Sequence, residues 1–383
     1  MPRIVLAALG LLLFAPALQA QEDLNIFGYF QSQYRYSVES AEVPIAGVVV
    51  YDGRTRTSFQ IQHLNVLASK NLSDDFSAFL NAELVNTFDS EKGFGELRLQ
   101  EAWVRYRSNR RFSARLGLMI PTFNNLNEVR NRAPLLPYVF RPIVYESSFY
   151  TLTYANTFIP QRAYVEASGT LPVSENVLFD YSAHFGTAEE DFASSDFVGT
   201  TSSGSDTTSY HAGGGRIGLR YDRFKAGVSG TYDIEGIGIA TVDGAPRIRY
   251  GADLSGVIGP VFFEAEYIGV SVDISDEDVQ TLAFIQANVA PTLPTNLDRT
   301  FYYGTLGVNF LDDQAFAYAS YNFLSGGITD IQIGDQKFYS VGGGYKPTFG
   351  LTFKAQYLHF VSEGTPFLEF EGNYVFLGAS VLF

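Results

Sequence analysis

The chain has 383 residues, no cysteine, and 41 acidic against 26 basic residues, which gives a formal net charge of −15. Without cysteine it can form no disulfide framework and carry no lipid on a cysteine, and its acidity argues against nucleic acid as a partner. The 24 Tyr, 33 Phe and 36 Gly residues, with a mean hydropathy near zero, favour strands that alternate apolar and polar side chains.

The N-terminal segment has the features of a secretory signal peptide. Arg3 supplies the positive region, residues 4–17 are apolar, and Ala20 is a small residue before a cut. A membrane anchor is the alternative, but the apolar run is shorter than the roughly 20 residues that a spanning helix needs. We therefore expect residues 1–20 to be removed and residues 21–383 to form the mature protein. No other stretch could span as a helix, so any spanning structure must be a closed barrel.

Sixteen candidate strands follow, separated alternately by short turns and long connections. They are residues 24–38, 57–68, 75–87, 97–107, 112–120, 161–171, 176–187, 210–220, 224–233, 247–256, 261–272, 300–310, 314–325, 337–346, 351–361 and 373–383. Most are close to the length of about 9 to 11 residues with which a tilted strand crosses a bilayer. The pattern predicts an all-β chain, a transmembrane antiparallel β-barrel of sixteen strands.

Several strands alternate clearly between an apolar and a polar face. In residues 247–254, Ile248 and Leu254 share one parity, and Arg249 and Asp253 share the other. Residues 59–67 and 97–106 break the alternation partway, as a β-bulge does. The polar parity predicts a wet interior.

The connection at about residues 121–160 carries five prolines and a group of charged side chains. The prolines exclude a regular strand through the region. The connection resembles the loop that general porins fold into the lumen, and this resemblance implies that it folds inward and constricts a pore. The candidate constriction residues are Arg130, Arg132, Arg141, Glu128 and Glu146. The alternative is an additional hairpin at Ser148–Phe158, which would make eighteen strands.

A second group of charges lies within the strands, at parities assigned to the lumen. The candidate wall residues are Arg35, Arg98, Arg115, Arg162, Glu166, Arg216 and Arg249. Opposed charges of this kind set a transverse field that screens solutes by charge and size, although solvated pairs that only stabilise the wall are the alternative. Acidic residues in the connections 189–206 and 273–278 could bridge to lipopolysaccharide through divalent cations, but their spacing matches no metal loop and we predict no metal site.

Catalytic motifs are absent from the sequence. Gly213–Gly218 formally matches a dinucleotide pattern, but no helix is expected after it. A lipase that assembles His184 with a distant Ser is the remaining enzyme alternative. We predict no enzyme activity and no cofactor.

Two segments carry a family resemblance. The final strand alternates apolar residues and ends on Phe383, and Leu97–Phe123 contains Glu-Ala-Trp-Val-Arg-Tyr, a tight turn and Arg-Leu-Gly-Leu-Met-Ile-Pro-Thr-Phe. These segments resemble bacterial outer-membrane porins of the sixteen-stranded general and phosphate-selective groups. The run of basic residues with which the phosphate-selective group captures anions has no clear equivalent here.

The resemblance implies passive diffusion of small hydrophilic solutes and ions across the outer membrane of a Gram-negative bacterium. It also implies a homotrimer in contact with lipid and lipopolysaccharide, and recognition of Phe383 by the barrel assembly machinery. Two other functions stay open at this point: a channel specific for anions, phosphate or apolar molecules, and a structural or adhesive barrel that transports nothing.

Overall fold

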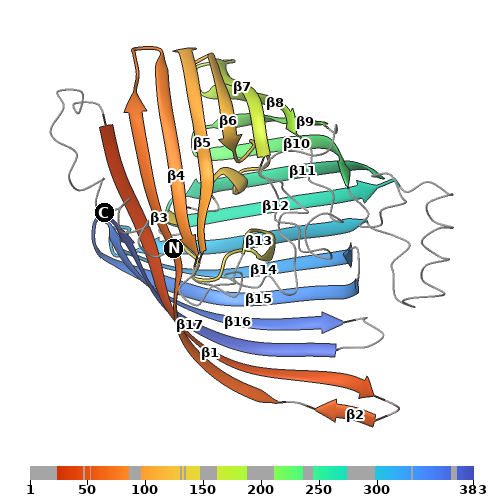
Figure 1. Cartoon of the computed structure of the whole chain (residues 1–383). Helices are drawn as coiled ribbons and strands as arrows, with labels where there is room; N and C mark the ends of the chain where they lie inside the picture. The colour runs from red at the N-terminus through yellow and green to blue at the C-terminus, as the bar shows by residue number, and fades with distance from the viewer. Residues whose placement is uncertain are drawn as a thin grey trace, which may run out of the picture.

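The computed structural model describes residues 24–45, 48–51, 53–85, 96–129, 132, 135–146, 162–187, 211–235, 245–273, 298–328, 331–363 and 369–383. These residues form a single antiparallel sheet that curls round on itself (Figure 1). None of the helices among them has the length and hydropathy of a membrane-spanning helix.

Each of the sixteen predicted strands is present, and a short additional strand extends the wall. The strands are β1 (Leu24–Ile45), β2 (Val48–Tyr51), β3 (Arg54–Asn71), β4 (Phe76–Val85), β5 (Glu96–Asn109), β6 (Phe112–Met119), β7 (Arg162–Pro172), β8 (Val177–Thr187), β9 (His211–Tyr221), β10 (Phe224–Glu235), β11 (Ala245–Ile258), β12 (Val261–Val272), β13 (Arg299–Phe310), β14 (Ala315–Ile328), β15 (Ile331–Thr348), β16 (Leu351–Glu363) and β17 (Glu369–Leu382). β2 pairs with the end of β1 and prolongs the β1–β3 hairpin, so it adds no strand to the circumference.

The barrel closes between its first and last strands. β1 pairs with β17 from Tyr29↔Leu382 to Glu42↔Glu369, and Gly28 and Phe383 exchange two backbone hydrogen bonds. β6 pairs directly with β7, which leaves no place in the wall for an additional hairpin between them. The wall therefore has sixteen strands, not eighteen; Ser148–Phe158 itself lies outside the described residues.

The side-chain alternation predicted from the sequence is present in the wall. On β11, Ile248 and Leu254 are exposed on the outer face, whereas Arg249 and Asp253 are buried within the barrel. The register shifts by one residue between β1 and β3 and again between β4 and β5, inside the two stretches where bulges were predicted. These shifts keep the polar side chains directed inward on both sides of each bulge.

The segment after β6 runs inside the barrel, not across its rim (Figure 1). We call its described residues 121–129, 132 and 135–146 the inward loop. It contains two short 3-10 helices, η1 (Asn127–Val129) and η3 (Ile143–Tyr145). With five prolines in residues 121–160, this segment cannot supply the regular donor ladder of a strand, and it lies where other groups of the wall satisfy its backbone.

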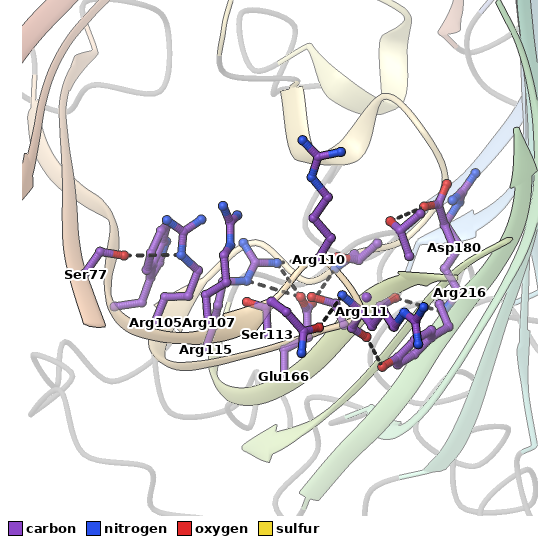
Figure 2. Close-up of a pocket in the computed structure, with 18 of the residues that line it drawn as sticks. Ser77, Arg105, Arg107, Arg110, Arg111, Ser113, Arg115, Glu166, Asp180 and Arg216 are labelled. Carbon is purple, nitrogen blue, oxygen red and sulfur yellow. Dashed lines mark hydrogen bonds and ion pairs between the residues drawn. The ribbon is translucent and has the colours of Figure 1, made fainter. Parts of the chain in front are cut away.

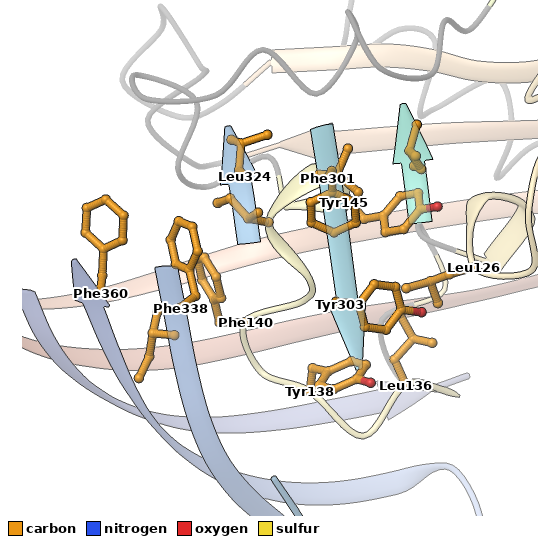
Figure 3. Close-up of a cluster of buried hydrophobic side chains, with 14 of the residues drawn as sticks. Leu126, Leu136, Tyr138, Phe140, Tyr145, Phe301, Tyr303, Leu324, Phe338 and Phe360 are labelled. Carbon is orange, nitrogen blue, oxygen red and sulfur yellow. The ribbon is translucent and has the colours of Figure 1, made fainter. Parts of the chain in front are cut away.

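Aromatic side chains on the inner face of β13–β17 receive the inward loop (Figure 3). We call this set the aromatic wall; it comprises Phe301, Tyr303, Phe316, Tyr318, Phe338, Phe360, Tyr374 and Phe376. Phe140 of the loop stacks near Phe376 and Phe338, with ring centroids 5.7 and 6.4 Å away. This contact explains why the inward face of the last strand is apolar although it faces the interior of the barrel.

Candidate functional site: a cationic cavity beside the inward loop

Two buried side chains of the wall hold the backbone of the inward loop. The Glu266 carboxylate on β12 accepts hydrogen bonds from the N–H groups of Asn125 and Leu126, at 3.0 and 2.6 Å, and from the Tyr145 hydroxyl at 2.6 Å. The Gln356 amide on β16 accepts from the N–H groups of Val139 and Phe140 and donates to the Phe140 carbonyl. The loop backbone therefore finds in the wall the partners that a strand would find in its neighbours.

Tyr138 adds a third attachment. Its hydroxyl donates to the Glu264 carboxylate on β12 and lies 2.7 Å from the Thr305 hydroxyl on β13. Burial, reinforced by the Glu264 charge, raises the pKa of Tyr138 well above its ordinary value. The phenol therefore remains a donor at any physiological pH.

The side of the lumen opposite the aromatic wall is open. A cavity of about 1100 Å³ lies between the inward loop and the inner faces of β1 and β3–β10 (Figure 2). Two carboxylates, Glu166 and Asp180, line it together with nine cationic side chains: Arg105, Arg107, Arg110, Arg111, Arg115, Arg132, Arg216, Arg220 and Lys225. We call it the cationic cavity, and its sign is opposite to the net charge of the chain.

Three of the nine cations are neutralised by ion pairs. Arg115 bonds to Glu166, Arg216 lies 2.6 Å from Asp253, and Arg220 lies 2.6 Å from Asp180. Among the described residues, the other six form no ion pair with a carboxylate. The cavity therefore keeps an excess of positive charge after its internal pairs are counted.

A short turn and the strand before it concentrate this charge. Arg105 and Arg107 point inward from β5, and Arg110 and Arg111 occupy the turn that leads into β6 (Figure 2). Arg105 donates to the Ser77 hydroxyl at 3.2 Å and lies over the ring of Trp103. The Trp103 ring also stacks on Phe79 and has the Arg115 guanidinium over it. Packing therefore fixes the side chain of Arg105, the first of a row of four arginines (Arg105, Arg107, Arg110 and Arg111) that faces the open cavity.

The structure distributes the predicted constriction residues over different environments. Arg132 is exposed and lines the cationic cavity. Arg141 and Glu146 are 2% and 0% exposed and pair with each other, so they face one another and not the open space. Glu128 belongs to η1, but its side chain, like the whole of Arg130, is outside the described residues.

Most of the predicted wall residues that the structure describes are engaged in the interior of the barrel. Glu166 is fully buried against Arg115, and Arg249 shares the Asp233 carboxylate with Arg247, each at 2.8 Å. Arg35 is buried on β1, and Arg98 lies opposite Glu83 in the β4–β5 register. Arg162 pairs with Met119 through its backbone, and its side chain is outside the described residues.

The arginines at the β5–β6 turn were missed as site residues. Arg105, Arg107, Arg110 and Arg111 fall, together with the predicted wall residue Arg115, within eleven residues of sequence, a density of basic residues that could have indicated them. Arg132, Arg216, Arg220 and Lys225 line the same cavity from the loop, β9 and β10, so residues distant in sequence add to this cluster of positive charge.

The described residues contain no group of three or more His, Asp or Glu side chains that could hold a metal ion.

Comparison with known proteins relates the chain to outer-membrane channels through its fold. No protein-family model and no curated protein sequence matches it. Among solved structures, the anion-selective porin from Comamonas acidovorans is 11% identical with a TM-score of 0.61, over 94% of this chain and 99% of that one. The outer-membrane channel DcaP of Acinetobacter baumannii is 14% identical with a TM-score of 0.58, over 94% and 97%. OmpF of Salmonella typhi, in complex with daunomycin, is 12% identical with a TM-score of 0.54, over 96% and 99%. The chain thus has the sixteen-stranded barrel fold of the porins.

Proposed function

We propose that the protein is a porin of the bacterial outer membrane, a water-filled channel through which small hydrophilic solutes and ions diffuse. The observation that carries the proposal is a closed barrel with an apolar outer face, a polar inner face and an open cavity inside. Only closed barrels and helices satisfy their backbone groups in a bilayer. The solved porins and channels with the same fold support this proposal.

The accompanying assignments belong to the same proposal. Residues 1–20 act as a cleaved signal peptide, residues 21–383 form the mature barrel, and the connection 121–160 narrows the channel. The barrel is a homotrimer that contacts lipid and lipopolysaccharide, and its assembly depends on Phe383. We infer a channel and not an enzyme, because the sequence carries no recognised catalytic motif and the porins and channels named above share this fold.

The cationic cavity favours anions over cations as the preferred solutes. Six of its nine cations form no ion pair with a described carboxylate, and such a lining raises the local concentration of anions. The resulting channel would remain a diffusion pore with a charge preference. The corresponding property is stated for the Comamonas acidovorans porin with the same fold.

Electrical recording from the purified protein in planar bilayers under a salt gradient tests both the channel function and the anion preference. We expect stepwise conductance and a reversal potential of anion sign. Replacing Arg107, Arg110 and Arg111 together with Gln should move the reversal potential toward zero, whereas Arg223→Gln, at the exposed β9–β10 turn outside the cavity, should not. A complete lack of conductance contradicts the channel, and a reversal potential of cation sign contradicts the anion preference alone.

A further inference from the structure

Three aromatic side chains on the inner face of the barrel lie outside the cover of the inward loop. Phe27 on β1, Phe79 on β4 and Trp103 on β5 line the cationic cavity. Phe27 is 40% exposed and the other two are partly exposed, whereas every ring of the aromatic wall is at most 6% exposed. Because these three rings face the lumen, they are not part of an aromatic belt at the membrane interface. Apolar groups that gather in a cavity and remain in contact with water are characteristic of a ligand site.

The strand register leaves a gap between two of these rings. Ser69 on β3 pairs with Phe79 on β4 and with Asn25 on β1, and Phe27 lies two residues further along β1. Two strand spacings separate β1 from β4, about 10 Å in all. The small side chain of Ser69 therefore leaves room for a third ring, which needs a contact of about 3.5 to 4 Å on each face. We call Phe27, Ser69 and Phe79 the aromatic slot.

Trp103 and Arg105 fix the orientation of the aromatic slot. Phe79 stacks on Trp103 of the next strand with ring centroids 4.9 Å apart, so the opposite face of Phe79 turns toward β3. Arg105 donates to the Ser77 hydroxyl at 3.2 Å, which draws its guanidinium from β5 toward β4 (Figure 2). Ser77 lies two residues from Phe79 on the same strand face. An aromatic surface and a guanidinium without a described ion pair therefore meet at one end of the slot.

Support of the neighbouring arginines does not account for all three rings. The guanidinium groups of Arg105 and Arg115 lie over the Trp103 ring, at 5.8 and 5.7 Å from its centroid, and these contacts explain Trp103 as a packing residue. No such contact is described for Phe27, and it belongs to no described ring pair. Its ring is the exposed side of the aromatic slot.

We propose that the aromatic slot binds aromatic carboxylates, with the ring between Phe27 and Phe79 and the carboxylate on the Arg105 guanidinium. A flat ring there continues the stack that Phe79 and Trp103 begin, in the offset geometry that aromatic pairs prefer. A guanidinium binds a carboxylate through two parallel hydrogen bonds. The wider cationic cavity enriches any anion, and the slot distinguishes an anion that carries a ring. Passage of such compounds through the barrel rests on the proposed channel function, whereas their binding does not.

Fluorescence of the purified protein measures this binding without reference to conduction. Trp103 is the one tryptophan of the chain and lies next to the slot, so it transfers energy to a bound ring that absorbs tryptophan emission. Anthranilate is an aromatic carboxylate with that absorption and serves as the probe. We expect benzoate to displace it at about one tenth of the concentration needed for acetate, which has no ring, or for benzyl alcohol, which has no charge. Cyclohexanecarboxylate, which has the charge but no flat ring, should require about three times the concentration of benzoate.

Variants separate the slot from the charge of the cavity. Ser69→Leu fills the space between the two rings without changing any charge, and should weaken anthranilate binding about tenfold. Ser113→Leu is the same substitution on β6, in the same cavity but away from the slot, and should leave binding unchanged. Phe27→Leu should weaken binding about threefold because one ring face is lost. Phe76→Leu, at a ring of β4 that is 45% exposed outside the cavity, should not.

Three outcomes overturn the slot: no energy transfer to anthranilate, displacement by acetate or benzyl alcohol at the same concentration as by benzoate, or full binding to a Ser69→Leu protein. The first two are measured on the unchanged protein and decide the question even where a variant does not assemble. In bilayers, benzoate should reduce the chloride current at the concentrations at which it displaces anthranilate. Ring-selective binding by a protein without conductance contradicts the channel function and leaves the slot standing, and conductance without ring-selective binding does the reverse.

Discussion

The two sides of the lumen share one alternating strand pattern but carry different inward side chains, aromatic on one side and cationic on the other. On β13–β17 the inward positions carry the aromatic wall, and the inward loop covers it. On β5, β6, β9 and β10 the inward positions include arginines and Lys225, and the space in front of them is open. Both sets of inward residues alternate with apolar outward residues, so the strand pattern does not distinguish them. The difference lies in what covers each inner face. The aromatic face is kept from water by the inward loop, whereas the arginines stay charged because water reaches them.

The largest expected effect comes from removing a ring on the loop side. Phe140→Ala deletes the aromatic group that packs between Phe338 and Phe376, and should lower the free energy of unfolding by roughly 3 to 5 kcal/mol, as for other buried aromatic truncations. Urea unfolding from lipid vesicles measures it. A loss below about 1 kcal/mol would show that the loop does not depend on the aromatic wall.

The next largest effect should come from a buried charge on β10, Asp233. Asp233→Asn leaves the guanidinium groups of Arg247 and Arg249 without their shared carboxylate in a site at most 1% exposed, at a cost of roughly 3 kcal/mol. Asp180→Asn is the matched control, because the Asp180–Arg220 pair is about a quarter to a third exposed and should contribute less than about 1 kcal/mol. Equal losses in the two variants would contradict the role of burial.

A smaller effect tests the polar attachment of the loop. Gln356→Leu removes the partner of the Val139 and Phe140 backbone groups and should cost about 2 kcal/mol. Gln33→Leu is the control, since Gln33 is equally buried on β1 but its amide has no hydrogen-bond partner among the described residues. In the same unfolding experiment, Gln33→Leu should not lower the free energy of unfolding. A decrease as large as that of Gln356→Leu would contradict the role of the hydrogen bonds that Gln356 makes with the loop.

The smallest effect on stability is expected in the cationic cavity. Arg110→Gln should change the free energy of unfolding by less than about 0.5 kcal/mol, because Arg110 forms no described ion pair, yet it should lower the anion preference in a salt gradient. Arg223→Gln, an exposed arginine outside the cavity, should alter neither. A selectivity that Arg110→Gln leaves unchanged would mean that the turn arginines lie away from the path of the ions.

Much of the barrel could be predicted from local patterns. A strand has a period of two, so the faces of β11 and the bulges near Gln62 and Gln100 are readable from neighbouring residues alone. The position of the inward loop in the chain is equally local, since its prolines exclude a strand. The sixteen strands and their alternation of short and long connections follow from the same information.

What only the tertiary structure decided is which distant residues meet. Gln356 binds Val139 across 217 positions of sequence, and Arg132, Arg216 and Lys225 reach the arginines of the β5–β6 turn from separate elements. No local pattern distinguishes an inward Phe that receives a loop from an inward Arg that faces water, because both satisfy the same parity. Closure of the sheet brings the strands into a ring, and the inward loop can cover only one side of the inner face. The covered side is therefore packed with aromatic side chains, and the uncovered side keeps its charged side chains.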